Sequence, residues 1–253
     1  SLTTDNYDEN SEYVITLKEA FKDNPNFLRK YLYADWSALD MINQLIPSEV
    51  IISSAERIEN GLEVTSMGID VARYGDDKTV FTILKNGNIE LIESYEQTSI
   101  TEIVTRSIQL IHDYNIDPNY VGIDSVGVGA GVVDNLKSAG YDVIELQGGS
   151  KPEESQYEEA FLPFNLRSQM YYELRRDMMN GQIGNLTDET LKLELQSIQY
   201  EIYSDKKVKV ISKEAIKKLL GRSPDYADSL VYANWVKTYR GGIKWYMAIS
   251  GGL

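Results

Sequence analysis

The sequence predicts an α/β protein with a mixed sheet, in which three antiparallel strands precede parallel strands and helices flank the sheet. Three observations lead to this prediction. The tripeptide Gly-Ile-Asp closes two separate β-favouring runs, at Asp70 and Asp124, and is followed by Gly-rich sequence each time. Asn86-Gly87 between two apolar runs is typical of a β-hairpin. Residues 99–102, Ser-Ile-Thr-Glu, are typical of a capping box that opens a helix.

The first part of the predicted sheet consists of three strands in succession, at residues 63–71, 78–85 and 89–96. A turn at residues 73–77 and the hairpin signal separate them, so neighbouring strands should run antiparallel. The helix that follows the capping box has an apolar face that includes Ile103, Ile108 and Ile111. An Asp-Pro pair at residues 117–118 breaks the chain before the second Gly-Ile-Asp strand.

The second part of the chain is predicted to alternate between helices and strands. The expected elements are a helix at 132–138, a strand at 142–146, an acidic loop at 148–163, a helix capped by Asn165, a helix or strand at 191–203, a strand at 208–211 and a last helix to about residue 239. Ser223 as N-cap and Pro224 as first helical residue signal that last helix. This order of elements is that of the ribonuclease H fold, in which the first and fourth strands are parallel neighbours.

The ribonuclease H order places Asp70 and Asp124 together at one end of the sheet. Side chains alternate along a strand, so each Asp shares a face with the Gly two residues earlier, and we expect this Gly to clear space beside the carboxylate. Two nearby carboxylates repel each other and need a proton, a cation or a metal between them. Turn formation or helix capping is the alternative role for either Asp taken alone.

The last helix supplies a third acid, because Asp225 and Asp228 are three residues apart on one helix face. Asp225 lies in the first turn, where an acid complements the helix dipole. Asp228 lies beside an apolar stripe that includes Trp235, so its carboxylate needs a partner and it is the preferred functional acid. Asp70, Asp124 and Asp228 could hold two divalent cations about 3.5–4 Å apart, with Asp70 bridging them.

Composition restricts the kind of metal site and the location of the protein. The 253 residues, 42% of them hydrophobic, include no cysteine and one histidine, His112, which excludes thiolate and multi-histidine sites within the chain. Carboxylate oxygens then favour Mg²⁺ or Mn²⁺. The absence of a secretory signal and of an apolar run of about 18 residues predicts an intracellular protein that does not span a membrane.

The net charge of -14 argues against nucleic-acid binding over the whole surface. One local basic run stands out against this background. Its members, interrupted by the acid Glu214, are Lys206, Lys207, Lys209, Lys213, Lys217, Lys218 and Arg222. This run either contacts DNA phosphates or is the solvated face of a hairpin and a helix.

The chain is predicted to have three segments. Residues 1–60 are expected to be a helical linker, with helices at 27–33 and 36–46, the second ended by Pro47. Residues 61–240 are expected to form the α/β domain. Residues 241–253 are expected to be a Gly-flanked aromatic tail.

Four motifs follow one another along the α/β segment. They are Gly-Ile-Asp-Val-Ala-Arg-Tyr-Gly-Asp-Asp-Lys-Thr at 68–79, Gly-Ile-Asp-Ser-Val-Gly-Val-Gly-Ala-Gly at 122–131, Phe-Asn-Leu-Arg-Ser at 164–168 and Gly-Arg-Ser-Pro-Asp-Tyr-Ala-Asp-Ser-Leu at 221–230. Together they resemble the nuclease domain of the large terminase subunit of tailed bacteriophages, the DNA-packaging motor. The stretch at 21–36 also resembles the segment that joins the motor domain of this family to its nuclease.

The resemblance implies a metal-dependent endonuclease that cuts concatemeric double-stranded viral DNA during genome packaging. It implies Asp70, Asp124 and Asp228 as catalytic, metal-binding acids, and Asp76 and Asp225 as further metal-binding or supporting positions. The expected cofactors are two Mg²⁺ or Mn²⁺ ions. Arg167 joins the basic run as a candidate DNA contact.

The resemblance also implies the setting in which such a domain works. Expected partners are double-stranded DNA and, in the full assembly, the terminase small subunit and the portal. The expected location is the host cytoplasm, transiently on the procapsid. No P-loop motif occurs, so the ATPase domain is expected to be absent from this chain.

Three other interpretations remain open from the residues. An actin-like or sugar-kinase-like phosphotransferase would use the Gly-rich stretch after Asp124 as a phosphate loop, but it leaves the acids of the last helix unexplained. A non-catalytic portal or capsid docking domain is suggested by the aromatic tail, and it predicts neither metal binding nor cleavage. A related nuclease, such as a junction resolvase, would prefer branched DNA.

Overall fold

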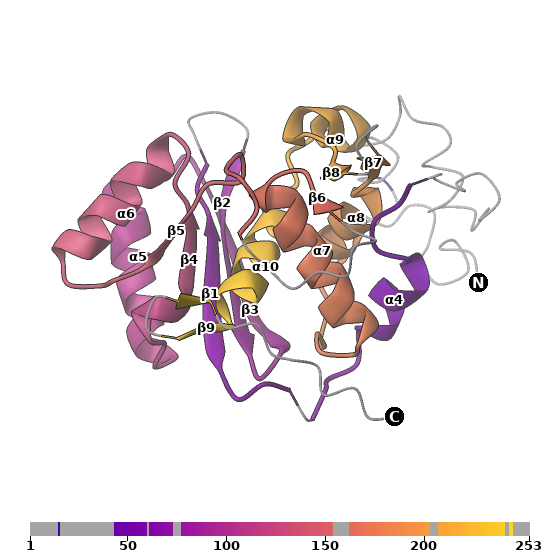
Figure 1. Ribbon diagram of the computed structural model, residues 1–253. Helices are drawn as coiled ribbons and strands as arrows, with labels where there is room; N and C mark the ends of the chain where they lie inside the picture. The colour runs from indigo at the N-terminus through magenta and orange to yellow at the C-terminus, as the bar shows by residue number, and fades with distance from the viewer. Residues whose placement is uncertain are drawn as a thin grey trace.

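A five-stranded mixed sheet forms the centre of the computed structural model, which describes residues 15, 43–59, 61–72, 77–153, 162–202, 207–240 and 243–244 (Figure 1). The strand order is β3-β2-β1-β4-β5. The strands are β1 (Thr65–Asp70), β2 (Lys78–Lys85), β3 (Asn88–Glu96), β4 (Val121–Asp124) and β5 (Ile144–Leu146). Strand β1 pairs antiparallel with β2 and parallel with β4, and β4 pairs parallel with β5. The predicted α/β fold class, with a ribonuclease H-like sheet, is confirmed.

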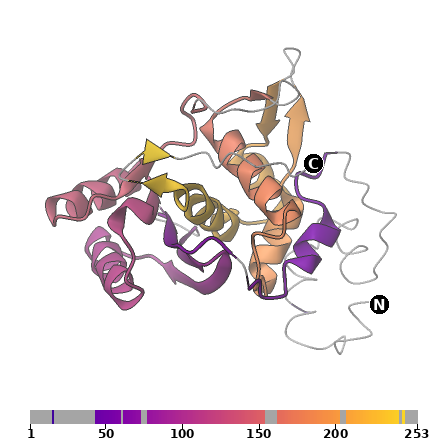
Figure 2. The same cartoon turned by 60° about the horizontal axis from the view of Figure 1, so that its bottom comes forward.

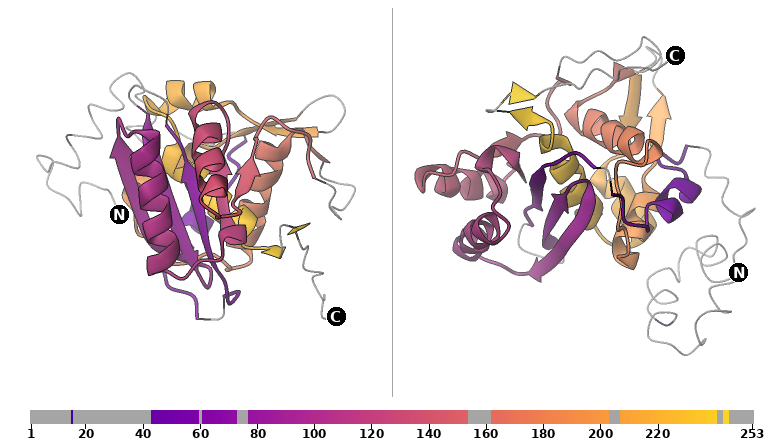
Figure 3. Two further views of the ribbon diagram at one scale, coloured as in Figure 1. Left: turned by 90° about the vertical axis from the view of Figure 1, so that its left-hand side faces the viewer. Right: turned by 90° about the horizontal axis from the view of Figure 1, so that it is seen from below.

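Helices cover both faces of this sheet. Figure 3 shows α5 (Ile100–Asp113) and α6 (Val128–Ser138) on one face, where they share an apolar core with β1, β2 and β4. On the other face α10 (Asp225–Val236) lies between the sheet and α7 (Leu166–Met179) (Figure 2). The predicted capping box is present at the start of α5, where Ser99 and Glu102 exchange hydrogen bonds.

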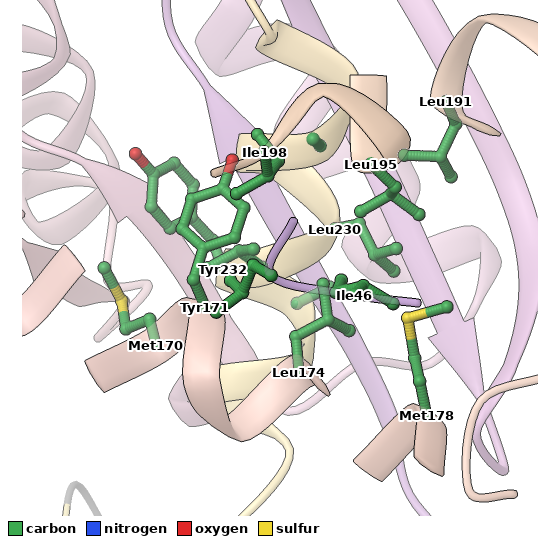
Figure 4. Packing of buried hydrophobic residues seen from close by; sticks show 14 of the residues in the cluster. Ile46, Met170, Tyr171, Leu174, Met178, Leu191, Leu195, Ile198, Leu230 and Tyr232 are labelled. Atoms are coloured by element: carbon green, nitrogen blue, oxygen red, sulfur yellow. The ribbon is translucent and has the colours of Figure 1, made fainter. Parts of the chain in front are cut away.

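A second lobe packs outside α10. It contains α4 (Ser48–Ser53), α8 (Glu189–Ser197), α9 (Lys213–Leu220) and a small sheet of order β6-β8-β7, made of β6 (Leu162–Pro163), β7 (Tyr200–Ile202) and β8 (Lys207–Val210). Figure 4 shows apolar side chains of α7, α8 and α10 packed together, among them Leu174, Leu195 and Leu230. Ile46 and Ile51 are buried in the same cluster.

Three short elements complete the described chain. They are the 3₁₀ turn η2 (Pro118–Tyr120) before β4 and the strands β9 (Tyr239–Arg240) and β10 (Ile243–Lys244), which pair antiparallel. No helix in the described part of the chain combines the length and the apolar character needed to cross a bilayer.

The two Gly-Ile-Asp glycines have a different role from the one predicted. A Cβ on Gly68 would lie 2.0 Å from the carbonyl oxygen of Ser229, and one on Gly122 would lie 2.8 Å from Cγ1 of Val236. These glycines therefore let α10 pack directly on β1 and β4. The expectation that they leave open space beside the carboxylates is wrong, because α10 fills that space.

Several predicted boundaries also need correction. Residues 43–46 are not helical, and Pro47 is the N-cap of α4 rather than the end of a helix. Helix α6 begins at Val128, four residues before the predicted start, because Gly127 turns the chain with a φ of 71°. Pro224, not Ser223, occupies the N-cap of α10. The acidic loop predicted at 148–163 contains β6 at its end. The predicted helix at 27–33 and residues 36–42 of the predicted helix at 36–46 lie outside the described residues.

Candidate active site

Three acids predicted to meet do lie at one end of the central sheet. Asp70 and Asp124 are the last residues of the parallel neighbours β1 and β4, whose register pairs Ile69 with Ile123. Asp228 lies in the first turn of α10. This helix packs directly on β1 and β4 because Gly68 and Gly122 have no side chain. Electrostatic interactions link all three carboxylates. We call Asp70, Asp124 and Asp228 the acid cluster.

The ammonium group of Lys213 lies between two members of the acid cluster. Its Nζ is 3.1 Å from both oxygens of Asp70 and 2.9 Å from Oδ2 of Asp228. Lys213 is the first residue of α9, so this helix brings a positive charge to the end of β1. The two acids raise the pKa of Lys213 well above its usual range even though burial lowers it. The ammonium therefore stays charged.

Asp228 has the most complete set of partners in the acid cluster. Its Oδ1 accepts hydrogen bonds from the Tyr171 hydroxyl at 2.6 Å and from Nη2 of Arg167 at 3.2 Å. Arg167 also donates to the carbonyl of Ile211 and stacks over the Tyr171 ring. Burial would raise the pKa of Asp228, but Lys213, Arg167 and the Tyr171 hydrogen bond together hold the pKa below its usual value. Asp228 is therefore ionised.

The other two acids are less well compensated. Burial raises the pKa of Asp70 well above its usual range, the Lys213 ammonium opposes this shift, and the neighbouring carboxylates add to it. Burial also raises the pKa of Asp124, although its Oδ1 accepts a hydrogen bond from the Val126 amide. A further cation at the strand ends would therefore stabilise the ionised form of both carboxylates.

Asp225 and Asp76 were the two additional acids of the prediction. Asp225 is buried at the start of α10, and its Oδ2 accepts a hydrogen bond from the backbone N–H of Lys78 at 2.9 Å. This bond ties α10 to β2 and gives Asp225 a structural role beside the acid cluster. Asp76 lies outside the described residues.

The predicted basic run divides into two groups. Lys207 and Lys209 lie on one face of β8, and Nζ of Lys209 is 4.9 Å from the centre of the Phe164 ring. Lys213, Lys217 and Arg222 lie in or just after α9 and form ion pairs with acids, as does Arg167 of α7. Lys217 contacts Asp77 at 2.7 Å, and Arg222 contacts Glu194 at 2.6 Å. Lys206 lies outside the described residues.

Two residues of the site were missed by the sequence analysis. Tyr171 follows Arg167 by one helical turn, a spacing that puts both on one face of α7, but a Tyr in an apolar stripe is usually core. Glu194 belongs to a stretch for which helix and strand were both open. Burial raises the pKa of Glu194 to about 8, against the opposing effects of Arg222 and the Ala227 amide.

The donor set of the site suits a hard divalent cation. Asp70 and Asp228 direct carboxylate oxygens at one cationic group, the Lys213 ammonium, and carboxylate oxygens are the ligands that Mg²⁺ and Mn²⁺ prefer. Among the described residues, no group of three or more His, Asp or Glu side chains is arranged to hold a metal ion. The Lys213 ammonium lies between the carboxylates of Asp70 and Asp228.

Comparisons with known proteins identify the fold. No family model matches the chain, and no curated protein matches it. The nuclease domain of the large terminase subunit of bacterial virus Sf6 matches with a TM-score of 0.64 and 20% identity, over 75% of this chain and 97% of that chain. A variant of the Sf6 domain with manganese and β-thujaplicinol matches with a TM-score of 0.63 and 20% identity, over the same shares of the two chains.

A second phage gives the same result. The large terminase nuclease of thermophilic phage G20c with bound magnesium matches with a TM-score of 0.51 and 19% identity, over 76% of this chain and 97% of that chain. Both phages supply domains that this chain covers almost completely. The chain therefore has the fold of the nuclease domains of phage large terminase subunits.

Proposed function

We propose that the chain is a metal-dependent endodeoxyribonuclease, the nuclease domain of a large terminase subunit, which cleaves concatemeric double-stranded viral DNA during genome packaging. One observation carries this proposal. Asp70 of the central strand β1 and Asp228 of α10 both contact the ammonium group of Lys213, and Asp124 interacts electrostatically with Asp70. The likeness to terminase nucleases, two of them with manganese or magnesium, supports it.

We assign the acid cluster to two divalent cations, Mg²⁺ or Mn²⁺. In this assignment Asp70, Asp124 and Asp228 would hold the two cations. When bound, such cations lower the pKa of an attacking water and stabilise the leaving 3′ oxygen of a phosphodiester. Arg167 and Tyr171 hold the Asp228 carboxylate in place and ionised. Asp225 supports the site from the start of α10, and Asp76 remains a proposed additional ligand.

The basic residues divide into two roles in this proposal. Arg167, Lys213, Lys217 and Arg222 are paired with acids, so their proposed contribution to DNA binding is to balance charge near the cleaved phosphate. Lys207 and Lys209, with Lys206, are the proposed contacts to the DNA backbone, because a row of lysines on one strand face attracts phosphates without sequence preference.

The setting of the reaction follows from the proposed function. Residues 61–240 form the nuclease domain in this proposal, between a linker at 1–60 and a tail at 241–253. The terminase small subunit and the portal would be partners in the full assembly, in the host cytoplasm. The ATPase motor would reside outside this chain, which has no P-loop motif.

Digestion of supercoiled and linear plasmid with Mg²⁺, Mn²⁺ or EDTA tests the proposed function. We expect cleavage with either metal and none with EDTA. Asp70→Ala, Asp124→Ala and Asp228→Ala should each lower the rate at least 100-fold, because each removes a ligand of an essential metal. Asp225→Ala should lower it less, since Asp225 binds the Lys78 backbone. Metal-dependent cutting by Asp70→Ala at the wild-type rate would refute the two-metal assignment.

A further inference from the structure

Helix α10, which carries Asp228, begins without a side-chain hydrogen bond from its N-cap residue. Pro224 precedes α10, and no side chain at this N-cap position accepts a hydrogen bond. The first N–H groups of any helix have no acceptor within the helix, so a buried start needs acceptors from elsewhere. Asp225, Ala227 and Asp228 are all buried. An acceptor from another element is therefore required.

Glu194 of α8 supplies such an acceptor. Its Oε2 accepts a hydrogen bond from the backbone N–H of Ala227 at 2.8 Å, and its Oε1 accepts one from Nη1 of Arg222 at 2.6 Å. The Glu194 side chain is completely buried. One carboxylate thus joins α8, the turn between α9 and α10, and the first turn of α10.

The two partners of Glu194, Ala227 and Arg222, are each close in sequence to an element of the site. Ala227 directly precedes Asp228 along α10. Arg222 follows Gly221, the left-handed residue that ends α9, and α9 is the helix that begins with Lys213. Glu194 is thus placed to fix the position of Asp228 without entering the acid cluster.

We propose that Glu194 is a positioning residue of the candidate active site: its hydrogen bond to Ala227 and its ion pair with Arg222 fix the start of α10 and, through it, the Asp228 carboxylate. This inference rests on the proposed function. Partners that orient a metal ligand are typically worth 10–100-fold in metal affinity. If the pair had only a stabilising role, its removal would lower the free energy of unfolding and leave the acid cluster unchanged.

Asp177 provides a matched control at the opposite end of α10. It is a buried acid on α7 that pairs with Lys237 at 2.9 Å and accepts a hydrogen bond from Asn234 at 3.1 Å. Its removal also leaves a buried partner uncompensated on or next to α10. The difference is that Asn234 and Lys237 lie after Asp228, toward the end of the helix.

The test compares Glu194→Ala, Glu194→Gln and Asp177→Ala in the full chain. The first measurement needs neither metal nor DNA: the ¹³Cζ resonance of Tyr171, whose hydroxyl donates to Asp228, identified with Tyr171→Phe. The second is Mn²⁺ affinity by calorimetry. We expect Glu194→Ala to shift the Tyr171 resonance and weaken Mn²⁺ binding at least tenfold. Glu194→Gln keeps an acceptor for Ala227 and should recover most of the affinity. Asp177→Ala should match wild type within twofold.

Two outcomes would overturn the inference. One is a wild-type Tyr171 resonance and Mn²⁺ affinity in Glu194→Ala, and the other is an equal change in Asp177→Ala. If Glu194→Ala does not fold, Arg222→Gln decides, since it breaks the ion pair and should shift the Tyr171 resonance; an unmoved resonance in Arg222→Gln would overturn the inference. A wild-type protein that binds Mn²⁺ but cuts no DNA would refute the proposed function and leave the positioning result standing.

Discussion

At the scale of single residues, Lys213 decides the electrostatics of the acid cluster. One ammonium lies within reach of two buried carboxylates and offsets part of their charge, so it stabilises the site in the absence of a metal. The same ammonium competes for the carboxylate oxygens that a divalent cation would bind. Lys213 is therefore expected to lower the affinity for a metal and to raise the stability of the metal-free protein.

We expect Lys213→Ala to destabilise the protein in EDTA by about 1–3 kcal/mol, less than a fully buried ion pair because a third of the lysine side chain is exposed. The same variant should bind Mn²⁺ about tenfold more tightly, because the ammonium no longer competes. Urea unfolding in EDTA and calorimetric titration with Mn²⁺ measure the two effects.

Lys217→Ala is the matched control for this prediction. Lys217 lies one turn further along α9 and pairs with Asp77 at an exposed position, where an ion pair contributes at most about 1 kcal/mol. Lys217→Ala should change neither the stability in EDTA nor the Mn²⁺ affinity appreciably. Weaker Mn²⁺ binding by Lys213→Ala would mean that the lysine assists the metal instead of competing with it.

At the scale of elements, the packing of α10 on β1 and β4 builds the site. A strand pair alone can bring Asp70 and Asp124 together, but Asp228 reaches them only because two glycines allow the helix backbone to touch the sheet. The distance between a helix and a sheet is normally set by side chains on both, so a missing side chain at Gly68 has a direct structural effect.

We expect Gly68→Ala to lower both stability and cleavage. The added methyl group would overlap the backbone of Ser229 and Ala233, which cannot move without displacing α10. Overpacking of this kind costs about 1–3 kcal/mol, and a displaced Asp228 should slow cleavage about 100-fold. Chemical denaturation and plasmid digestion below the unfolding transition give the two values.

Gly149→Ala serves as the control for Gly68→Ala, because a Cβ at Gly149 would meet no atom within 4 Å. It should stay within about 0.5 kcal/mol of wild type and cut DNA normally. A Gly68→Ala protein as stable and active as Gly149→Ala would show that α10 tolerates a wider gap from β1.

At the scale of the whole molecule, the charge distribution determines how DNA can approach. The net charge of -14 repels a polyanion from most of the surface. Lys207 and Lys209 place two positive side chains on one face of β8. DNA should therefore reach the acid cluster from the side of the small sheet.

We expect Lys207→Glu combined with Lys209→Glu to weaken DNA binding and to flatten its dependence on salt, because fewer counterions are released. Cleavage of long DNA should fall about tenfold or more, with Mn²⁺ affinity unchanged. Fluorescence anisotropy at several salt concentrations, calorimetry and plasmid digestion measure these effects.

A double variant of equal charge, Lys85→Glu with Lys137→Glu, controls for net charge. Lys85 pairs in register with Thr65, at the opposite end of β1 from Asp70, and Lys137 lies in the last turn of α6. It should weaken binding much less. Equal losses in the two double variants would mean that overall charge, rather than the face of β8, governs DNA binding.

The sequence by itself predicted the central sheet and all three members of the acid cluster. Alternating apolar runs, the Asn86-Gly87 hairpin and the capping box at Ser99 are local signals, and each occurs where it was predicted. The repeated Gly-Ile-Asp placed Asp70 and Asp124 on neighbouring parallel strands, because periodicity and element order suffice for that inference. Asp228 was chosen over Asp225 from its position in the helix, and the structure gives Asp225 a separate bond to β2.

Only the tertiary structure decided how charges and glycines pair over long distances in the chain. Lys213 lies 143 residues from Asp70, and Tyr171 lies 57 residues from Asp228, so no local pattern predicts either contact. Gly68 was predicted to open space, yet the space is filled by a helix that begins more than 150 residues later. Glu194 is an unremarkable acid in a sequence of ambiguous periodicity, and its importance appears only when α8 packs against an uncapped helix start. Local structural propensity depends on neighbouring residues and can be inferred from the sequence. Burial and the pairing of charges depend on which distant segments pack together in the fold.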